Sequence, residues 1–295
     1  MDRPNEQYTF IKKDDPGFPE ILKRYAFMPE YLYFKGSLPD PDTPAIAIVG
    51  ARSCSTYGRS QAESLARVLA ENGVQVISGL AFGIDSCAHE GALAGGGKTF
   101  AVMGCGIDLC YPASNRRLYG RILETGGGIL SEYPPGAPAL AYHFPIRNRI
   151  ISALSDAVIV CEAKQRSGSL ITANYALEQG KTIYALPGRV SDRLSTGCND
   201  LIRQGAFPLL SAEQVLEDLG IEKRMKKEEQ PRDIREGLDP DEIRLMKCLS
   251  DDPKTLGEIC AESGLSHSVL ACLIVKLEMK GLINEPLAGS YCRGH

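Results

Sequence analysis

Basic side chains and small residues gather between Phe144 and Thr172, in the stretch FPIRNRIISALSDAVIVCEAKQRSGSLIT. A helix that begins at Ser-Gly-Ser presents backbone N–H groups that carry partial positive charge and lack internal partners, which suits an anion. We therefore predict phosphate contacts from Arg147, Asn148, Arg149, Lys164, Ser167, Gly168 and Ser169. The alternative interpretation is that the two arginines are solvated helix residues and that Ser-Gly-Ser is only a loop.

The elements that must position these side chains alternate between strands and helices. Short, continuously apolar runs are typical of strands buried on both faces, and they occur at 45–50, 74–78, 99–103, 127–130, 156–162 and 181–188. Apolar residues recur at helical spacing between them, over 58–72, 85–94, 118–123 and 170–179. We predict an α/β fold, with an extended Rossmann-like, doubly wound, mostly parallel sheet.

Ligands bind such sheets at the carboxyl ends of the strands, where the direction of winding reverses. Glycines and cations follow the predicted strands, at Gly50, Arg52, Gly79, Gly83, Gly104 and Arg189. Glycines there fit a bulky ligand lying against main-chain N–H groups, and tight turns are the alternative explanation. We expect Arg52, Lys164 and Arg189 to converge on one rim with Arg147 and Arg149.

The sequence contains none of the common nucleotide-binding or catalytic motifs considered below. The first strand is followed by GARSCS, not GxGxxG, and no GxxxxGK[ST] segment occurs. His89 and Asp85 fit structural roles in and before a helix, with Asp85 expected to cap it. We therefore predict no catalytic residue, no metal and no cofactor, and a site that holds phosphates without breaking bonds.

Composition limits the possible partners and compartments. The 295 residues carry a net charge of -4, so binding to a polyanion must come from a local patch. Ten cysteines are scattered with no CxxC pair, which favours reduced thiols. No apolar run approaches the roughly 18 residues of a membrane span, and MDRPNEQY has no signal-peptide h-region. We expect a cytoplasmic protein that does not enter membranes.

The pattern divides the chain into four parts. Residues 1–43 are rich in proline and aromatics and read as a lead-in that packs on the core, and 44–219 form the Rossmann-like domain. Residues 220–238 carry dense charge of both signs and suit a linker. Three amphipathic helices and a hairpin over 239–295 predict a winged helix. Its third helix offers a thin set of polar groups, which favours protein contact or weak duplex binding over sequence readout: Ser266, His267, Ser268, Lys276 and Lys280.

Seven motifs in one order resemble those of the DNA-processing protein A family (DprA, also called Smf). They are IVGARSCSTYG, ISGLAFGIDSCAHEGAL, VMGCGIDLCYP, LSEYPPG, FPIRNRIISALS, EAKQRSGSLITANYALEQGKTIYALPG and GCNDLIRQGA, and they cover roughly residues 20 to 210. The resemblance implies a single-stranded DNA-binding protein that protects incoming DNA and loads the RecA recombinase during natural transformation or homologous recombination. A winged helix follows the Rossmann region in many members of this family.

The resemblance also implies roles for particular residues. Arg52 matches the arginine of the family's VGxR turn, and Lys164 matches the lysine after its acid-alanine step; both are associated with DNA binding. Arg147 and Arg149 match the FPxRNR arginines. A homodimer through the end of the Rossmann region would involve Leu201, Ile202 and Leu209. Because single strands expose bases as well as phosphates, Phe144, Tyr142 and His143 are candidates for base stacking, with a core role as the alternative.

Two other classes of function remain open. Rossmann-like proteins of the lysine-decarboxylase-like family hydrolyse nucleoside monophosphates through a PGGxGT motif, of which the turn Pro187-Gly188-Arg189-Val190 lacks the second glycine and the threonine. A transcription regulator would read duplex DNA with its winged helix and sense a nucleotide with its Rossmann part.

Overall fold

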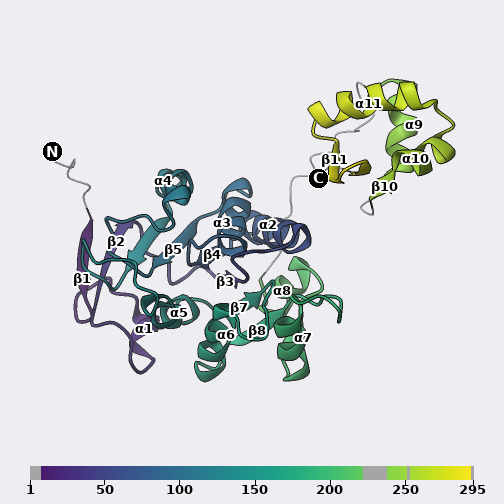
Figure 1. Cartoon of the computed structure of the whole chain (residues 1–295). Helices are drawn as coiled ribbons and strands as arrows, with labels where there is room; N and C mark the ends of the chain where they lie inside the picture. Colours follow the sequence, from purple (N-terminus) through teal and green to yellow (C-terminus); the bar gives the residue numbers. More distant parts are fainter. Residues whose placement is uncertain (1–7, 222–237, 251–252, 294–295) are drawn as a thin grey trace. The chain divides into compact units, whose positions relative to one another are not determined.

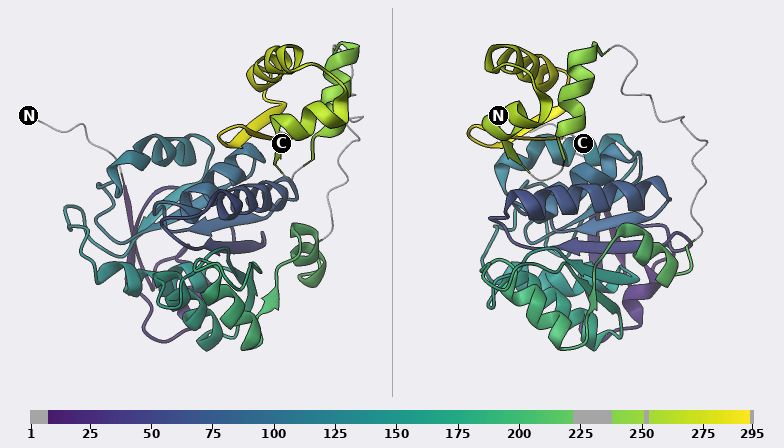
Figure 2. Two further views of the ribbon diagram at one scale, coloured as in Figure 1. Left: turned by 45° about the vertical axis from the view of Figure 1, so that its right-hand side comes forward. Right: turned by 90° about the vertical axis from the view of Figure 1, so that its right-hand side faces the viewer.

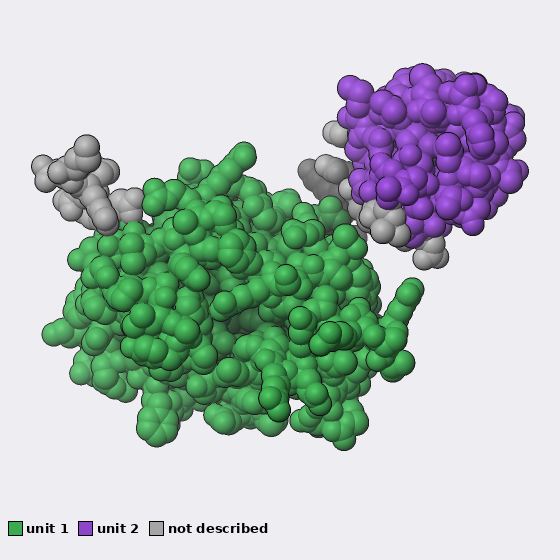
Figure 3. Space-filling view, in the orientation of Figure 1, with its two compact units in different colours: residues 1–224 green, residues 225–295 purple. Residues whose placement is uncertain are grey.

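The chain forms two compact units, residues 1–224 and residues 225–295 (Figure 3). A computed structural model describes residues 8–221, 238–250 and 253–293. The strands of unit 1 are β1 (Thr9–Lys12), β2 (Tyr31–Gly36), β3 (Ala45–Val49), β4 (Gln75–Ser78), β5 (Thr99–Met103), β6 (Gly128–Ser131), β7 (Ala157–Val160), β8 (Thr182–Ala185) and β9 (Phe207–Pro208). Its helices are α1 (Glu20–Lys23), α2 (Thr56–Glu71), α3 (Ile84–Ala94), the 3-10 turn η1 (Ala113–Asn115), α4 (Arg116–Glu124), α5 (His143–Ala153), α6 (Gly168–Glu178), α7 (Thr196–Arg203) and α8 (Ala212–Asp218).

All these strands join one sheet, in the order β1-β2-β6-β5-β4-β3-β7-β8-β9 (Figure 1). From β6 to β9 the neighbouring strands run parallel, which confirms the predicted doubly wound, mostly parallel sheet. β2 pairs antiparallel with β6, and β1 with β2. Residues 8–43, which lack any sustained period, thus extend the sheet by two strands.

Two layers of helices cover the sheet (Figure 2). On one face the side chains of β3 and β4 pack with α2, α3 and α8, while β5 and β6 pack with α4. On the other face the strands pack with α1, α5, α6 and α7. The central strands β3, β5 and β7 are buried along their whole length, as their continuous apolar runs require.

The sheet changes its direction of winding between β3 and β7. From β3 the chain steps through β4 and β5 to β6 on one side, and β7, β8 and β9 follow on the other. β3 and β7 are paired in parallel, so their carboxyl ends lie at the same edge, with Val49 opposite Val160. This is the position at which open α/β sheets bind ligands.

Unit 2 has the winged-helix arrangement that the sequence predicts. Its elements are α9 (Pro240–Cys248), β10 (Lys254–Thr255), α10 (Leu256–Ser263), α11 (His267–Met279), β11 (Ile283–Leu287) and β12 (Ser290–Arg293). The strands form a small sheet in the order β10-β12-β11. Capping boxes open α9 at Asp239 and α10 at Thr255. Most of the predicted linker, residues 222–237, lies outside the described residues.

The two lysines of α11 form ion pairs with Glu242 within unit 2. The Nζ atom of Lys276 lies 2.9 Å from the carboxylate of Glu242, and that of Lys280 lies 3.0 Å from it. Glu242 is 1% exposed, so one buried carboxylate neutralises part of the positive charge of this helix. This pairing reduces the set of groups with which α11 could contact a phosphate backbone.

In the described parts of the chain, no single helix has both the length and the apolar composition to cross a membrane. α10 and α11, bent by 109° at their junction, meet that criterion only when they are taken together.

Candidate nucleic-acid-binding site

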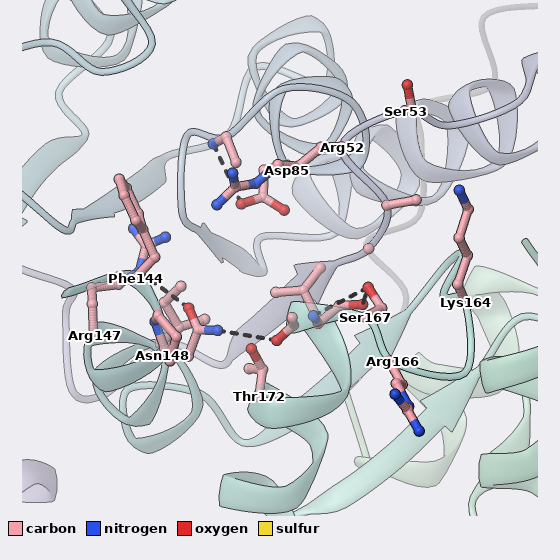
Figure 4. A pocket seen from close by; sticks show the side chains of 18 of the residues that line it. Arg52, Ser53, Asp85, Phe144, Arg147, Asn148, Lys164, Arg166, Ser167 and Thr172 are labelled. Atoms are coloured by element: carbon pink, nitrogen blue, oxygen red, sulfur yellow. Dashed lines mark hydrogen bonds between the residues drawn. The ribbon is translucent and has the colours of Figure 1, made fainter. Parts of the chain in front are cut away.

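A cavity of about 430 Å³ opens at the carboxyl ends of β3 and β7, where the winding reverses (Figure 4). Three segments line most of it: the loop after β3, the first half of α5, and the loop after β7 with the start of α6. Of the residues predicted to bind phosphate, the structure brings Gly50, Arg52, Arg147, Asn148, Lys164, Ser167, Gly168 and Ser169 to this cavity.

The loop after β3 presents Arg52 and is anchored from β7. Arg52 is exposed, and its guanidinium carbon lies 5.3 Å from the centroid of the Phe144 ring. Glu162, 1% exposed at the end of β7, accepts hydrogen bonds from the backbone N and the hydroxyl of Ser55, which in turn caps α2. Glu162 therefore fixes the loop that carries Arg52 to the neighbouring strand.

The start of α6 supplies polar groups on the opposite wall. Ser167 caps the helix, and its hydroxyl accepts a hydrogen bond from the Ser169 backbone N. Thr172, one turn further on, is 1% exposed and lines the cavity. Lys164 and Arg166 lie exposed in the preceding loop. A helix start flanked by two cations provides a favourable position for an anion.

Arg147 lies beneath the cavity rather than on an exposed rim. Its side chain is 3% exposed, and its Nη1 donates to the backbone oxygens of Gly79, at 3.0 Å, and Val102. Burial lowers the pKa of Arg147 to about 10, while the nearby Asp85 carboxylate acts in the opposite direction. Burial also raises the pKa of Asp85, against the effect of Arg147. At pKa about 10 the guanidinium remains charged at neutral pH, so it contributes positive potential to the cavity from below.

Asp85 does not cap α3 with its side chain as expected. The cap position is Gly83, and the Asp85 carboxylate instead accepts hydrogen bonds from the backbone N atoms of Gly79, at 3.1 Å, and Ala81, at 3.4 Å. The carboxylate thereby orders the loop after β4 beside Arg147. Asp85 also lines the cavity.

Two predicted arginines do not reach the cavity. Arg149 turns toward β6, where its Nη1 and Nη2 donate to the Glu132 carboxylate at 2.9 Å and 2.6 Å, and its Nε donates to the Phe27 backbone oxygen at 2.7 Å. Arg189 is exposed after β8 and lines none of the cavity. The expected convergence of five cations on one rim is therefore wrong for these two.

The glycines after β4 and β5 are explained by packing within the protein. A Cβ at Gly79 would overlap the Arg147 guanidinium and the Asp85 carboxylate, and one at Gly104 would press on Phe144. Gly83 has φ +75°, and a Cβ there would meet the backbone of Ala51 and Arg52. These three glycines do not line the cavity, so the close approach they allow is between segments of the protein and not to a ligand.

The aromatic candidates differ in their surroundings. Phe144 is half-buried in the cavity wall, between the guanidinium groups of Arg52 and Arg147 and next to Tyr111. His143 is buried and stacks on Tyr133 at 3.9 Å. Tyr142 is 62% exposed but does not line the cavity. Of these candidates, Phe144 is therefore the one placed to contact a ligand here.

Arg166 and Thr172 line the cavity but were not among the residues predicted to bind phosphate. Arg166 follows Lys164 in the same loop, so its positive charge and its position after β7 could have identified it from the sequence. Thr172 has no such signal, because only the packing of α6 shows that this residue lines the cavity. Among the described residues, no group of histidine, cysteine or acidic side chains is arranged to hold a metal ion.

Comparisons with known proteins agree with this geometry. Residues 9–220 match the family model of DNA recombination-mediator protein A, and residues 228–289 match the DprA winged helix domain. The chain is similar to DNA processing protein DprA of Streptococcus pneumoniae, with 46% identity over 68% of this chain and 71% of that protein. It is also similar to protein Smf of Synechocystis, with 33% identity over 96% of this chain and 80% of that protein.

Two solved structures are similar to this chain. The X-ray structure of S. pneumoniae DprA has a TM-score of 0.67 at 41% identity, covering 74% of this chain and 76% of that one. DNA processing protein A of Helicobacter pylori, described for its single-stranded DNA-binding mode, has a TM-score of 0.66 at 32% identity, covering 74% of this chain and 98% of that one. The match of the family model to most of the chain, together with these relatives, shows that the chain belongs to the DNA recombination-mediator protein A family.

Proposed function

We propose that this protein binds single-stranded DNA in the cavity at the β3–β7 switch point, without cleaving it. The observation that carries the proposal is the grouping of Arg52, Lys164 and Arg166 with the start of α6 around one cavity that also holds an aromatic face, Phe144. Fixed cations with a stacking surface are what an unpaired strand requires, because it offers repeating phosphates and exposed bases. The single-stranded DNA binding of the H. pylori relative supports the same assignment.

The polar groups divide into two kinds of contact. The backbone N–H groups at the start of α6, the Thr172 hydroxyl and the cations Lys164 and Arg166 suit a phosphate. Phe144 suits a base, and Arg52, which lies over its ring, can contact either the base face or the adjoining phosphate. Such contacts do not depend on base identity, so we expect little sequence preference.

A titration with a fluorescent oligothymidylate tests the proposal. Arg52→Ala and Lys164→Ala should each weaken binding and make its salt dependence shallower by about one charge, because each removes one phosphate contact. Arg189→Ala is the matched control, since Arg189 is an exposed arginine that does not line the cavity. Equal affinity of all three variants and the wild type would exclude this cavity as the binding site.

We further propose that the bound strand is handed to the RecA recombinase during natural transformation or homologous recombination. The support is membership of the family and the similarity to DprA proteins. RecA filament assembly on strands coated with single-strand-binding protein should be faster with this protein than without it. An equal rate would contradict the loading role. We place this activity in the cytoplasm, a reducing compartment that fits ten cysteines without a disulfide.

Self-association through the end of the Rossmann domain is part of the proposal. β9 is the last strand of the sheet, and Phe207 and Leu210 beside it are 53% and 76% exposed. Leu209, expected in the interface, is 5% exposed, and Leu201 and Ile202 pack partly against the core. An isologous contact would therefore use Phe207 and Leu210 in place of those three residues.

The two alternative functions find less support. The turn Pro187-Gly188-Arg189-Val190, compared above with the hydrolase motif, does not line the cavity. Lys276 and Lys280 of α11 are paired with Glu242, which weakens the case for a duplex-reading regulator.

A further inference from the structure

A second cavity, of about 560 Å³, borders the same two helices, α5 and α6, as the proposed DNA-binding cavity. Its lining is largely aromatic and aliphatic and includes Tyr25, Phe27, Ile146 and Tyr175. Phe27 comes from the turn between α1 and β2, in the segment that extends the sheet.

Phe27 is held in an unfavourable position. Its φ is +58°, in the left-handed region that residues with a Cβ rarely adopt, and its side chain is 91% exposed. An apolar ring fully in water on a strained backbone gains nothing for folding. Such strain is found at ligand clamps, where it presets a side chain for binding.

Arg149 fixes this turn from α5. Its Nε donates to the Phe27 backbone oxygen at 2.7 Å, while its other nitrogens form a two-point contact with Glu132. The side chains of Arg149 and Glu132 are each 13% exposed, so the support is well packed. The second arginine of FPIRNR thus positions Phe27 and does not bind a ligand with its own charge.

The two cavities border the same two helices, on different sides of α5 and on successive turns of α6. Asn148 lines the first cavity, and the next residue, Arg149, lines the second. On α6, Thr172 lines the first and Tyr175 the second, and three residues span about 4.5 Å along a helix. A strand that leaves the first cavity along α6 therefore reaches the second within a short distance.

We propose that this cavity is a second subsite for the same single strand, in which the Phe27 ring stacks on an unpaired base. The inference rests on the proposed function. A base fits better than a phosphate, because Arg149 is already neutralised by Glu132 and the carboxylate of Glu178 also lines the cavity. Aromatic stacking accepts every base, so the subsite adds affinity and length without adding sequence preference.

The test uses the absence of tryptophan from the chain. Phe27→Trp introduces a single indole whose fluorescence should fall when oligothymidylate of about 16 nucleotides binds, but not with one of about 4 nucleotides. Phe10→Trp is the matched control, because Phe10 of β1 is also an exposed aromatic but packs on Tyr31 and Tyr33 of β2 and should report no change. Phe27→Ala should weaken binding of the long oligomer about tenfold and leave the short one unchanged, and Phe27→Tyr should restore it.

The outcomes separate this subsite from the first cavity. Unchanged indole fluorescence with the long oligomer bound, together with wild-type affinity of Phe27→Ala, would overturn the subsite. If Phe27→Ala instead impairs only RecA loading, the surface binds protein and the subsite is also overturned. If Arg52→Ala binds like the wild type while the indole is quenched, the first cavity fails and the Phe27 subsite stands. A wild-type protein that binds neither oligomer contradicts both.

Discussion

The guanidinium carbon of Arg52 lies 5.3 Å from the centroid of the Phe144 ring, and that of Arg147 lies 5.9 Å from the same centroid. One aromatic ring from α5 is thus set between an exposed cation from the β3 loop and a buried cation from its own helix. We expect the ring to orient Arg52 before any ligand arrives, which would lower the entropy lost on binding.

Phe144→Leu should therefore weaken single-stranded DNA binding partly through Arg52. In a double-mutant cycle with Arg52→Ala, measured by oligothymidylate titration, we expect a coupling of about 0.5 to 1 kcal/mol. Tyr142→Leu is the control, because Tyr142, two residues before Phe144, is exposed but does not line the cavity. Strict additivity of Phe144→Leu and Arg52→Ala would show that the ring does not orient the arginine.

Arg147→Met should destabilise unit 1 by about 3 to 5 kcal/mol, because it removes the donor to two buried backbone oxygens and the positive charge near the buried Asp85. Urea unfolding followed by circular dichroism measures this change. Arg189→Met, at an exposed arginine, should stay within about 0.5 kcal/mol of the wild type. A stable Arg147→Met protein that no longer binds DNA would instead make Arg147 a direct ligand contact.

Acid should weaken unit 2 through Glu242. The side-chain hydrogen bond from Lys276, followed by the backbone of Asp239 and the Lys280 side chain, lowers the pKa of Glu242 to about 2. A carboxyl whose folded pKa is lowered contributes stability above its unfolded pKa of about 4.3, and that contribution is lost as the pH falls toward 2. We expect Glu242→Gln to be less stable than the wild type at pH 7, with the difference shrinking between about pH 4.5 and 2. Urea titrations of both proteins across this pH range measure the difference in their free energies of unfolding. A difference that stays constant with pH would exclude the Glu242 ion pairs as the cause of the lower stability.

Phe27→Gly should be more stable than Phe27→Ala, although both remove the ring. The two variants differ mainly in how well they tolerate φ +58°, which costs a residue with a Cβ about 1 kcal/mol more than glycine. Thermal unfolding of the pair measures the strain in this turn. Equal melting temperatures would indicate that the turn relaxes when the ring is removed.

Leu210→Glu should weaken self-association by about tenfold or more, because it places a charge in the exposed apolar surface beside β9. Sedimentation velocity over a range of concentrations measures the effect. Leu177→Glu, on α6 and 72% exposed, is the control for adding a charge at an exposed leucine elsewhere. A wild type that sediments as a monomer throughout would contradict the proposed dimer.

Local patterns in the chain were sufficient for much of the architecture. The buried apolar runs of β3, β5 and β7 specify strands, and parallel winding places their carboxyl ends at one edge. That rule was enough to bring Arg52, Lys164 and Ser167 to one cavity, because each directly follows β3 or β7 along the chain. The winged helix could likewise be read from its helical spacing and its capping residues, Asp239 and Thr255.

Tertiary structure alone decided the roles of the FPIRNR arginines. Two residues apart on a helix, Arg147 and Arg149 point to different faces, and nothing local says which face meets the cavity. Arg147 is buried because Gly79 and Val102, on β-strand ends far away in sequence, offer backbone oxygens to it. Arg149 binds Glu132 and the Phe27 backbone oxygen because β2 pairs antiparallel with β6. This pairing brings the turn before β2, which contains Phe27, beside α5. Contacts between segments so distant in sequence depend on the assembled sheet, and no local periodicity encodes them.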